Sequence, residues 1–349
     1  MSDNTITTSE APPADESAVS TGALAAVRRW AVVRIRKSFR ELGLFAALAA
    51  LWVYFGLKSE YFFTTDNIFN ILLQASNVAI IAAGLTVVII AAEIDLSIGA
   101  LQALAGSVAA VVIIRYEVPV AIGIPIALGC VVLAGAISGF LTWKVKIVSF
   151  ISTLAMLGIA QGAALLLTNG HSVYGFPESY RKIGTSNVYG VPTPAIIALV
   201  VFVALHLLLT RTTFGLKIYA TGGNAEAAAF AGIKVGRVKL IALMISGLTA
   251  GIGGLIVSSR LDAGNGLFGA GDLLGAVAAV VIGGTSLFGG VGSVVGTAIG
   301  VVIITTINNG LVLLAVQDFW QQIVIGCIII VAMMLDQLVK SARLPGFLR

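Results

Sequence analysis

Long apolar stretches that contain no charged residue make up most of the chain, and short polar segments separate them. The stretches cover residues 42–57, 67–92, 96–114, 118–143, 147–177, 183–210, 240–259, 273–317 and 319–335. A helix needs about 20 mainly apolar residues to cross a membrane. The stretch at residues 273–317 is too long for one crossing and is interrupted by TSLFGG, so we expect two helices there. The pattern predicts an all-α integral membrane protein with about ten transmembrane helices.

The composition excludes an ordinary soluble domain, because 58% of the residues are hydrophobic and only 11% are charged. The net charge is +5, but the basic residues stand between apolar stretches, so they indicate membrane topology and no nucleic-acid partner. Cys130 and Cys327 lie within predicted spans and indicate no disulfide. His171 and His206 have no metal-ligating neighbours in the sequence, so no metal site is predicted.

The two ends of the chain differ from its middle. Residues 1–22 are rich in Ser, Thr, Pro and acidic residues, so we expect residues 1–40 to form a disordered and then basic cytosolic segment. Residues 41–338 form the predicted transmembrane domain, and residues 339–349 form a cytosolic tail.

Basic residues are distributed unevenly between the two sides that ten crossings define. With the N-terminus inside, 16 of the 21 Lys and Arg residues fall in inner segments and 5 fall in outer segments. Cytosolic loops carry an excess of Lys and Arg. Both termini and the loop at residues 211–239 are therefore predicted to be cytosolic. The longest outer segment, at residues 169–192, has room for a short helix or lid.

The polar and basic loop at residues 211–239 has the local signals of a short helix. A Gly-Gly pair ends the preceding helix, Asn224 is a candidate N-cap, and residues 225–231 are mostly strong helix formers that Gly232 would terminate. A helix this short is marginal in water by itself. We therefore expect it to dock onto a membrane surface, onto its own bundle or onto another protein.

The same loop contains the Glu-Ala-Ala-x-x-x-Gly core of the cytoplasmic loop in bacterial ABC-importer permeases, as Glu226, Ala227, Ala228 and Gly232. The chain resembles the ribose, xylose and arabinose branch of sugar permeases in three further stretches: IDLSIG at residues 94–99, GGTSLFGGVGSVVGTAIG at residues 283–300 and NNGL at residues 308–311. Two departures are the missing Leu-Pro end of the broader importer motif and Glu93, which stands where Gly is common in the branch.

This resemblance implies an inner-membrane permease subunit that moves a sugar into the cytoplasm and has no ATPase site of its own. A separate ATP-binding subunit would bind ATP and Mg²⁺, an extracytoplasmic sugar-binding protein would deliver the solute, and two permease chains would form a homodimer. The residues implied to couple the chain to the ATP-binding subunit are Gly223, Asn224, Glu226, Ala227, Ala228 and Gly232.

Two alternatives stay open on the sequence alone. The local features of the loop also fit an ordinary amphipathic helix at the membrane surface. An ion-coupled secondary transporter could use Glu93 and Asp95, although Asp95 or Ser97 would also suit the cap of the third helix at its cytosolic end. The chain has no phosphate-binding G-x-x-x-x-G-K-[ST] loop, which favours a nucleotide bound by another chain.

Polar residues within or beside the predicted spans are candidates for the translocation pathway, although the same groups commonly hydrogen-bond between helices. The candidates are Asn77, Asp95, Ser97, Gln102, Ser149, Thr153, Asn308 and Asn309. Between residues 96 and 335, the predicted spans contain no acidic or basic residue away from their ends. A charged solute normally needs a complementary charge in its path, so we expect a neutral, polyhydroxylated solute such as a pentose, a hexose or a polyol.

Overall fold

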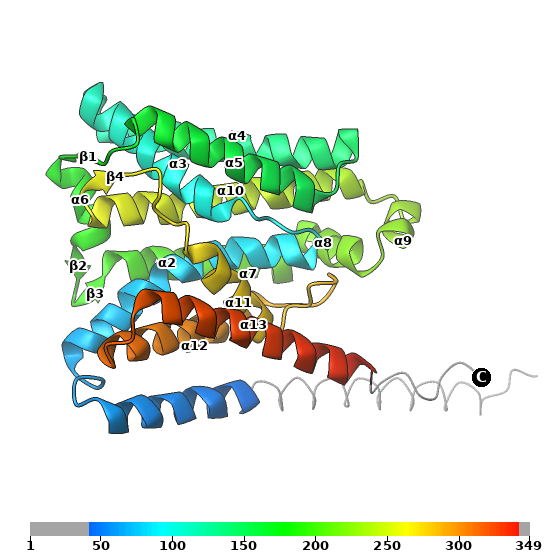
Figure 1. Cartoon of the computed structure of the whole chain (residues 1–349). Coiled ribbons are helices and arrows are strands. Elements are labelled where there is room, and N and C mark those ends of the chain that lie inside the picture. The colour runs from blue at the N-terminus through cyan, green and yellow to red at the C-terminus, as the bar shows by residue number, and fades with distance from the viewer. Residues whose placement is uncertain (1–41, 342–349) are drawn as a thin grey trace, which may run out of the picture. The chain divides into compact units, whose positions relative to one another are not determined.

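The computed structural model describes residues 42–341, so the predicted N-terminal segment, the last residues of the tail and both chain ends lie outside the described residues. Described residues from Ala47 onward belong to one compact unit. This unit is helical apart from two short antiparallel ladders (Figure 1). The all-α prediction is thus confirmed for the described part of the chain, with a minor contribution from strands.

The helices follow the predicted apolar stretches. In chain order they are a first helix Leu42–Lys58, α2 Thr65–Ile90, α3 Ile98–Ala110 with π-helix η1 Val111–Arg115, α4 Val120–Phe140 with π-helix η2 Leu141–Val145, α5 Ser149–Thr168, α6 Glu178–Thr185, α7 Thr193–Arg211, α8 Thr213–Gly223, α9 Ala225–Phe230, α10 Val235–Arg260, α11 Asp272–Ile282, α12 Val294–Leu313 and α13 Asp318–Ser341. Strand β1 (Val173–Tyr174) pairs with β4 (Ala263–Gly264), and β2 (Asn187–Val188) pairs with β3 (Val191–Pro192).

Seven helices among the described residues are long and apolar enough to cross a membrane. Three further apolar helices are shorter, namely Leu42–Lys58, Asp272–Ile282 and Phe319–Met334. Each of the nine apolar stretches overlaps at least one of these ten helices, and residues 273–317 overlap two, as expected. The number of crossings depends on whether the short helices span the bilayer, so ten crossings stays a prediction.

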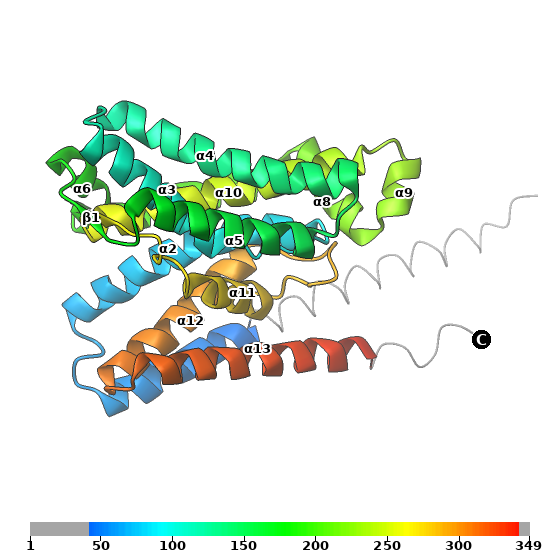
Figure 2. The ribbon, with the colours of Figure 1, turned by 45° about the horizontal axis from the view of Figure 1, so that its top comes forward.

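Helix α10 lies in the middle of the bundle and packs against α2, α3 and α4 (Figures 1 and 2). Glycines four residues apart make this packing close. A Cβ atom on Gly135 of α4 would lie 2.5 Å from the carbonyl oxygen of Leu243, and one on Gly247 of α10 would lie 2.5 Å from that of Val131. Because any side chain there would meet backbone, Gly135 and Gly247 let the two helices approach closely, as small residues commonly do in lipid.

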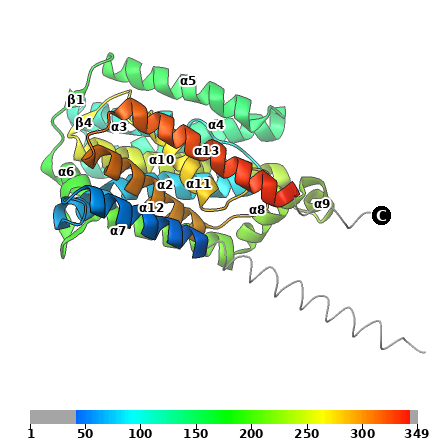
Figure 3. The same ribbon diagram turned by 60° about the horizontal axis from the view of Figure 1, so that its bottom comes forward.

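Two helices begin after stretches of irregular backbone. Residues 91–97 lead from α2 into α3, and residues 265–271 lead from β4 into α11. Helix α11 has only 11 residues and packs against α12 and α13 (Figure 3). Irregular backbone at membrane depth is tolerated only where protein buries it or where it lines a water-filled cavity. These two stretches therefore direct attention to the interior of the bundle.

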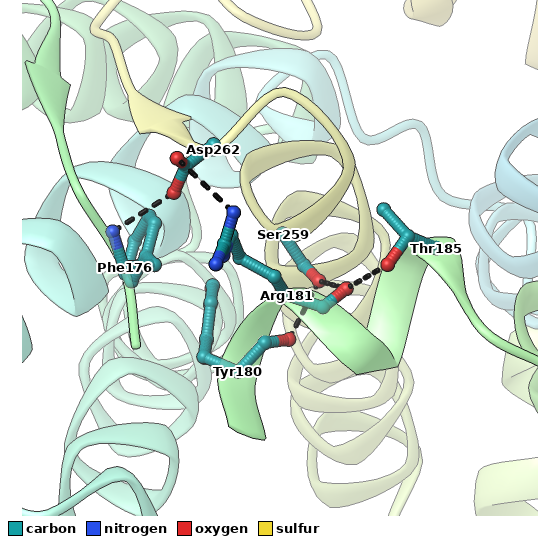
Figure 4. Close-up of polar contacts among 6 residues, drawn as sticks. All are labelled: Phe176, Tyr180, Arg181, Thr185, Ser259 and Asp262. Atoms are coloured by element: carbon teal, nitrogen blue, oxygen red, sulfur yellow. Dashed lines mark hydrogen bonds and ion pairs between the residues drawn. The ribbon is translucent and has the colours of Figure 1, made fainter. Parts of the chain in front are cut away.

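The predicted outer segment does contain a short helix, α6, which is hydrogen-bonded to the end of α10 (Figure 4). The Ser259 hydroxyl donates to the Tyr180 carbonyl oxygen at 2.7 Å and accepts from the Gly184 N–H at 2.8 Å. Asp262 accepts from the Phe176 N–H at 2.8 Å. Helix α6 lies at one end of the bundle, and α8 and α9 lie at the other (Figures 1 and 2).

Candidate functional site

The loop at residues 211–239 folds into two short helices at one end of the bundle (Figure 2). Asn224 is the N-cap of α9, and its Oδ1 accepts from the Ala227 N–H at 2.9 Å. Helix α9 ends at Phe230, and Gly232 follows with a φ of 82°, which favours glycine. The predicted cap, helix and terminator are all confirmed.

Helix α9 has one face that is exposed and one that packs against its own chain. Glu226 and Ala227 are exposed, whereas Ala228 is only 5% exposed and packs within its own chain. Phe230 is 93% exposed, although it is a large aromatic side chain. Sequence analysis missed Phe230, because a phenylalanine between apolar spans gives no signal of exposure. An exposed aromatic side chain at the end of a polar loop is typical of a surface that binds a partner protein.

Within the loop at residues 211–239, helix α8 contacts the membrane-embedded part of the chain. A Cβ atom on Gly222 would lie 1.7 Å from the carbonyl oxygen of Ile90, at the end of α2, whereas nothing lies within 4 Å of the same position on Gly223. The Tyr219 hydroxyl donates to the Gly292 carbonyl oxygen at 2.9 Å. Movement of α8 would therefore act directly on the end of α2 and on residues 283–293, which α8 contacts.

Glu93 forms an ion pair with Lys239 in the second turn of α10. Glu93 is buried, and the side chain of Lys239 is 23% exposed. The pair joins the irregular segment at residues 91–97 to the helix that follows α9. A paired carboxylate is a poor candidate for a free ion-coupling site, so this contact disfavours the secondary-transporter alternative.

Four of the pathway candidates lie together and hold the irregular segment in place. The Asp95 carboxylate accepts from the Ser97 N–H at 2.8 Å and from the Ser97 hydroxyl at 2.6 Å. Ser149 and Thr153 of α5 accept from the N–H groups of residues 94 and 96, both at 3.2 Å. Ser97 occupies the N-cap position of α3, but its side chain makes no capping bond. The contacts of these residues are structural.

Asn77 and Gln102 lie elsewhere, and the structure adds a residue that sequence analysis left out. The Nδ2 of Asn77 donates to Oδ2 of Asp272 at 2.7 Å. The Gln102 side chain lies beside the same carboxyl group. Asp272 stands between two of the predicted apolar stretches, and the structure brings it to Asn77 at the middle of α2.

The last two pathway candidates, Asn308 and Asn309, have different surroundings. Asn309 and Asn67 exchange hydrogen bonds of 2.8 and 3.0 Å, which link α12 to the start of α2. Asn308 is half-buried, and its Oδ1 has no hydrogen-bond partner among the described residues. In the described part of the chain, no group of three or more His, Cys, Asp or Glu residues is arranged to hold a metal ion.

Comparison with known proteins identifies a family that this chain matches. The family described as "Branched-chain amino acid transport system / permease component" matches residues 67–333. The chain is 42% identical to the ribose import permease protein of Escherichia coli (strain K12) over 295 residues, which are 83% of this chain and 91% of that protein.

Two other relatives agree. The D-allose transport system permease protein of the same strain is 40% identical over 305 residues, which are 86% of this chain and 93% of that protein. The xylose transport system permease protein of that strain is 34% identical over an alignment of 361 positions, gaps included, which covers 85% of this chain and 91% of that protein. No solved structure matches the chain. The family description names amino acids, whereas these relatives are named for sugars.

Proposed function

Because the chain belongs to the family of permease components of binding-protein-dependent transport systems that matches residues 67–333, we propose that it moves a neutral sugar or polyol into the bacterial cytoplasm as part of an ATP-driven ABC importer. Its multi-pass helical structure and its family assign it to the bacterial cytoplasmic (inner) membrane. The observation that supports the sugar assignment is the set of ribose, allose and xylose permeases that match over most of the chain.

ATP and Mg²⁺ would bind to a separate subunit, and the exposed tip of α9 is the candidate contact. Glu226, Ala227 and Phe230 are accessible to a partner there, and the buried Ala228 supports the helix from below. Closure of two ATP-binding subunits would draw the α9 helices of a permease homodimer together. Contacts of α8 with Ile90 and of Lys239 with Glu93 would pass that movement to the irregular segment at residues 91–97.

An extracytoplasmic sugar-binding protein would deliver the solute at the opposite end. That end has a hollow with charged side chains of both signs, including Glu178, Arg181, Lys182, Arg260 and Asp262. The Lys182 side chain holds the pKa of Glu178 below its usual range, so this carboxylate is charged at neutral pH. Charged side chains of both signs at this end suit transient binding of the polar surface of a sugar-binding protein.

This proposal requires the α9 end to be cytosolic, which the excess of basic residues on that side favours. In a Cys130→Ser and Cys327→Ser background, we expect Tyr189→Cys to react with a membrane-impermeant thiol reagent added outside intact cells. Glu226→Cys should react only after the cells are opened. Labelling of Glu226→Cys from outside would invert the topology and remove the basis for contact with an ATP-binding subunit.

The solute assignment can be tested by transport. In vesicles containing the permease with its ATP-binding subunit, supplied with its binding protein, we expect ATP-dependent uptake of at least one of D-ribose, D-allose and D-xylose. Leucine, which the family description makes the natural competitor, should not be taken up. Leucine uptake without uptake of any of the three sugars would contradict the assignment. Uptake driven by an ion gradient in the absence of ATP would instead restore the secondary-transporter alternative.

A further inference from the structure

Three polar side chains from three different helices meet inside the bundle. They are Asn77 of α2, Gln102 of α3 and Asp272, the first residue of α11. Asn77 donates to the Asp272 carboxylate at 2.7 Å, and Gln102 lies beside that carboxyl group. Asn77 is the thirteenth of the 26 residues of α2, so the cluster lies at the middle of that helix.

The cluster has unused hydrogen-bonding capacity. The Oδ1 of Asn77 and both amide atoms of Gln102 are buried, and no group in the described part of the chain meets them with hydrogen-bond geometry. Gln102 is only 1% exposed. A buried polar atom without a partner costs about 1–3 kcal/mol, and native proteins contain few of them. Three such atoms at one place indicate a group that joins them during the working cycle.

The exposure of Asp272 indicates what that group contacts. Gln102 is buried, but Asp272 and Asn77 are partly exposed, and Gly271 beside them is exposed. An ionised carboxylate facing lipid near the middle of a bilayer is costly, so such a residue normally faces a partner or a water-filled path. Asp272 also lies in the first turn of α11, where the positive end of the helix dipole stabilises a negative charge.

Glycines keep the space at the cluster free of other side chains. A Cβ atom on Gly253 of α10 would lie 2.9 Å from Oδ1 of Asn77 and 3.2 Å from Oε1 of Gln102. Gly269 has a φ of 84° and lies against the Gln102 side chain. At Gly269, the irregular segment at residues 265–271 thus brings backbone up to the Gln102 side chain.

We propose that Asn77, Gln102 and Asp272 bind hydroxyl groups of the solute as it passes through the membrane. This inference rests on the proposed function and adds a site to it. The carboxylate accepts from hydroxyl groups, and the two amides both donate to and accept from them, which suits a polyhydroxylated neutral molecule.

The decisive variant is Gln102→Met. It has nearly the same volume and removes only the amide atoms beside the Asp272 carboxyl group, so the variant should fold as the wild type does. If those atoms bind solute, however, the KM for ATP-dependent uptake of the transported sugar should rise about tenfold or more. Asp272→Asn should raise the same KM while leaving ATP-binding-subunit association unchanged. Gln74→Met, on the same helix as Asn77 and outside the cluster, should transport as the wild type does.

A solute analogue separates binding from a purely structural role. If D-ribose is the sugar transported, the ratio of D-ribose to deoxyribose uptake, measured with the 2-deoxy and 5-deoxy sugars, should fall toward one in Gln102→Met or Asp272→Asn. The same binding protein delivers the sugar to every variant, so its own preference cancels in this comparison. Unchanged KM values, or an equal decrease for all sugars, would overturn the inference. If the wild type transports no neutral sugar, the proposed function fails instead.

Discussion

Replacing Phe230 with alanine should weaken the association of the ATP-binding subunit about thirtyfold and reduce ATP-dependent uptake correspondingly. Phe230 is 93% exposed at the end of α9, and aromatic anchors at protein interfaces typically contribute about 2 kcal/mol or more, which is roughly a thirtyfold change in affinity. Pull-down or light-scattering titration of the ATP-binding subunit onto the detergent-solubilised permease measures the effect. Because no intramolecular packing is lost, the stability of the isolated permease should not change.

Tyr189 offers a matched control, since it is a fully exposed aromatic residue at the opposite end of the bundle. Tyr189→Ala should leave association with the ATP-binding subunit unchanged. Equal binding by the wild type and the Phe230→Ala variant would show that α9 does not use this side chain to dock. A substitution at Ala228 is a poorer test, because this residue is buried and an arginine there would displace α9 from its own chain.

Lys239→Met should lower the free energy of unfolding by about 3 kcal/mol, since removing one partner of a buried ion pair leaves an uncompensated charge. The charge left behind is the Glu93 carboxylate, whose side chain is 6% exposed. Chemical denaturation in mild detergent measures the change. Lys234→Met provides the control, because Lys234 is exposed at the cap of the same helix.

The double variant Glu93→Gln and Lys239→Met should recover most of the lost stability, because neither charge remains buried alone. Recovered stability with impaired uptake would mean that the pair matters for transmitting movement from α10 to residues 91–97. If Lys239→Met is as stable as the Lys234→Met control, the ion pair does not hold the segment, and movement must reach it through Gly222 and Ile90 alone.

Much of the architecture could be predicted from local patterns. Apolar stretches located every helix that could span, because the length of an apolar helix must match the bilayer. The cap at Asn224 and the terminator at Gly232 were predicted correctly, since both depend on neighbouring backbone groups only. The close contacts that Gly135 and Gly247 make with the backbone of another helix are known only from the structure.

For the candidate site residues, the sequence likewise showed local properties but not long-range contacts. Ser149, Thr153, Asp95 and Ser97 were chosen as pathway residues for their polarity, yet in the structure they hold one another and the backbone of residues 91–97. Asn309 likewise pairs with Asn67. A side chain's polarity is visible in the sequence, but its hydrogen-bond partner usually comes from a distant helix, so the sequence cannot separate a structural contact from a free group.

The sequence by itself therefore determined the membrane class, the position of the helices and the local form of the α9 loop, because each depends on residues close together in the chain. Only the tertiary structure decided that Ala228 faces inward and Phe230 outward, that Lys239 neutralises Glu93, and that Asp272 meets Asn77 in the interior. Those outcomes depend on packing between elements that are distant in the sequence, which no local pattern encodes.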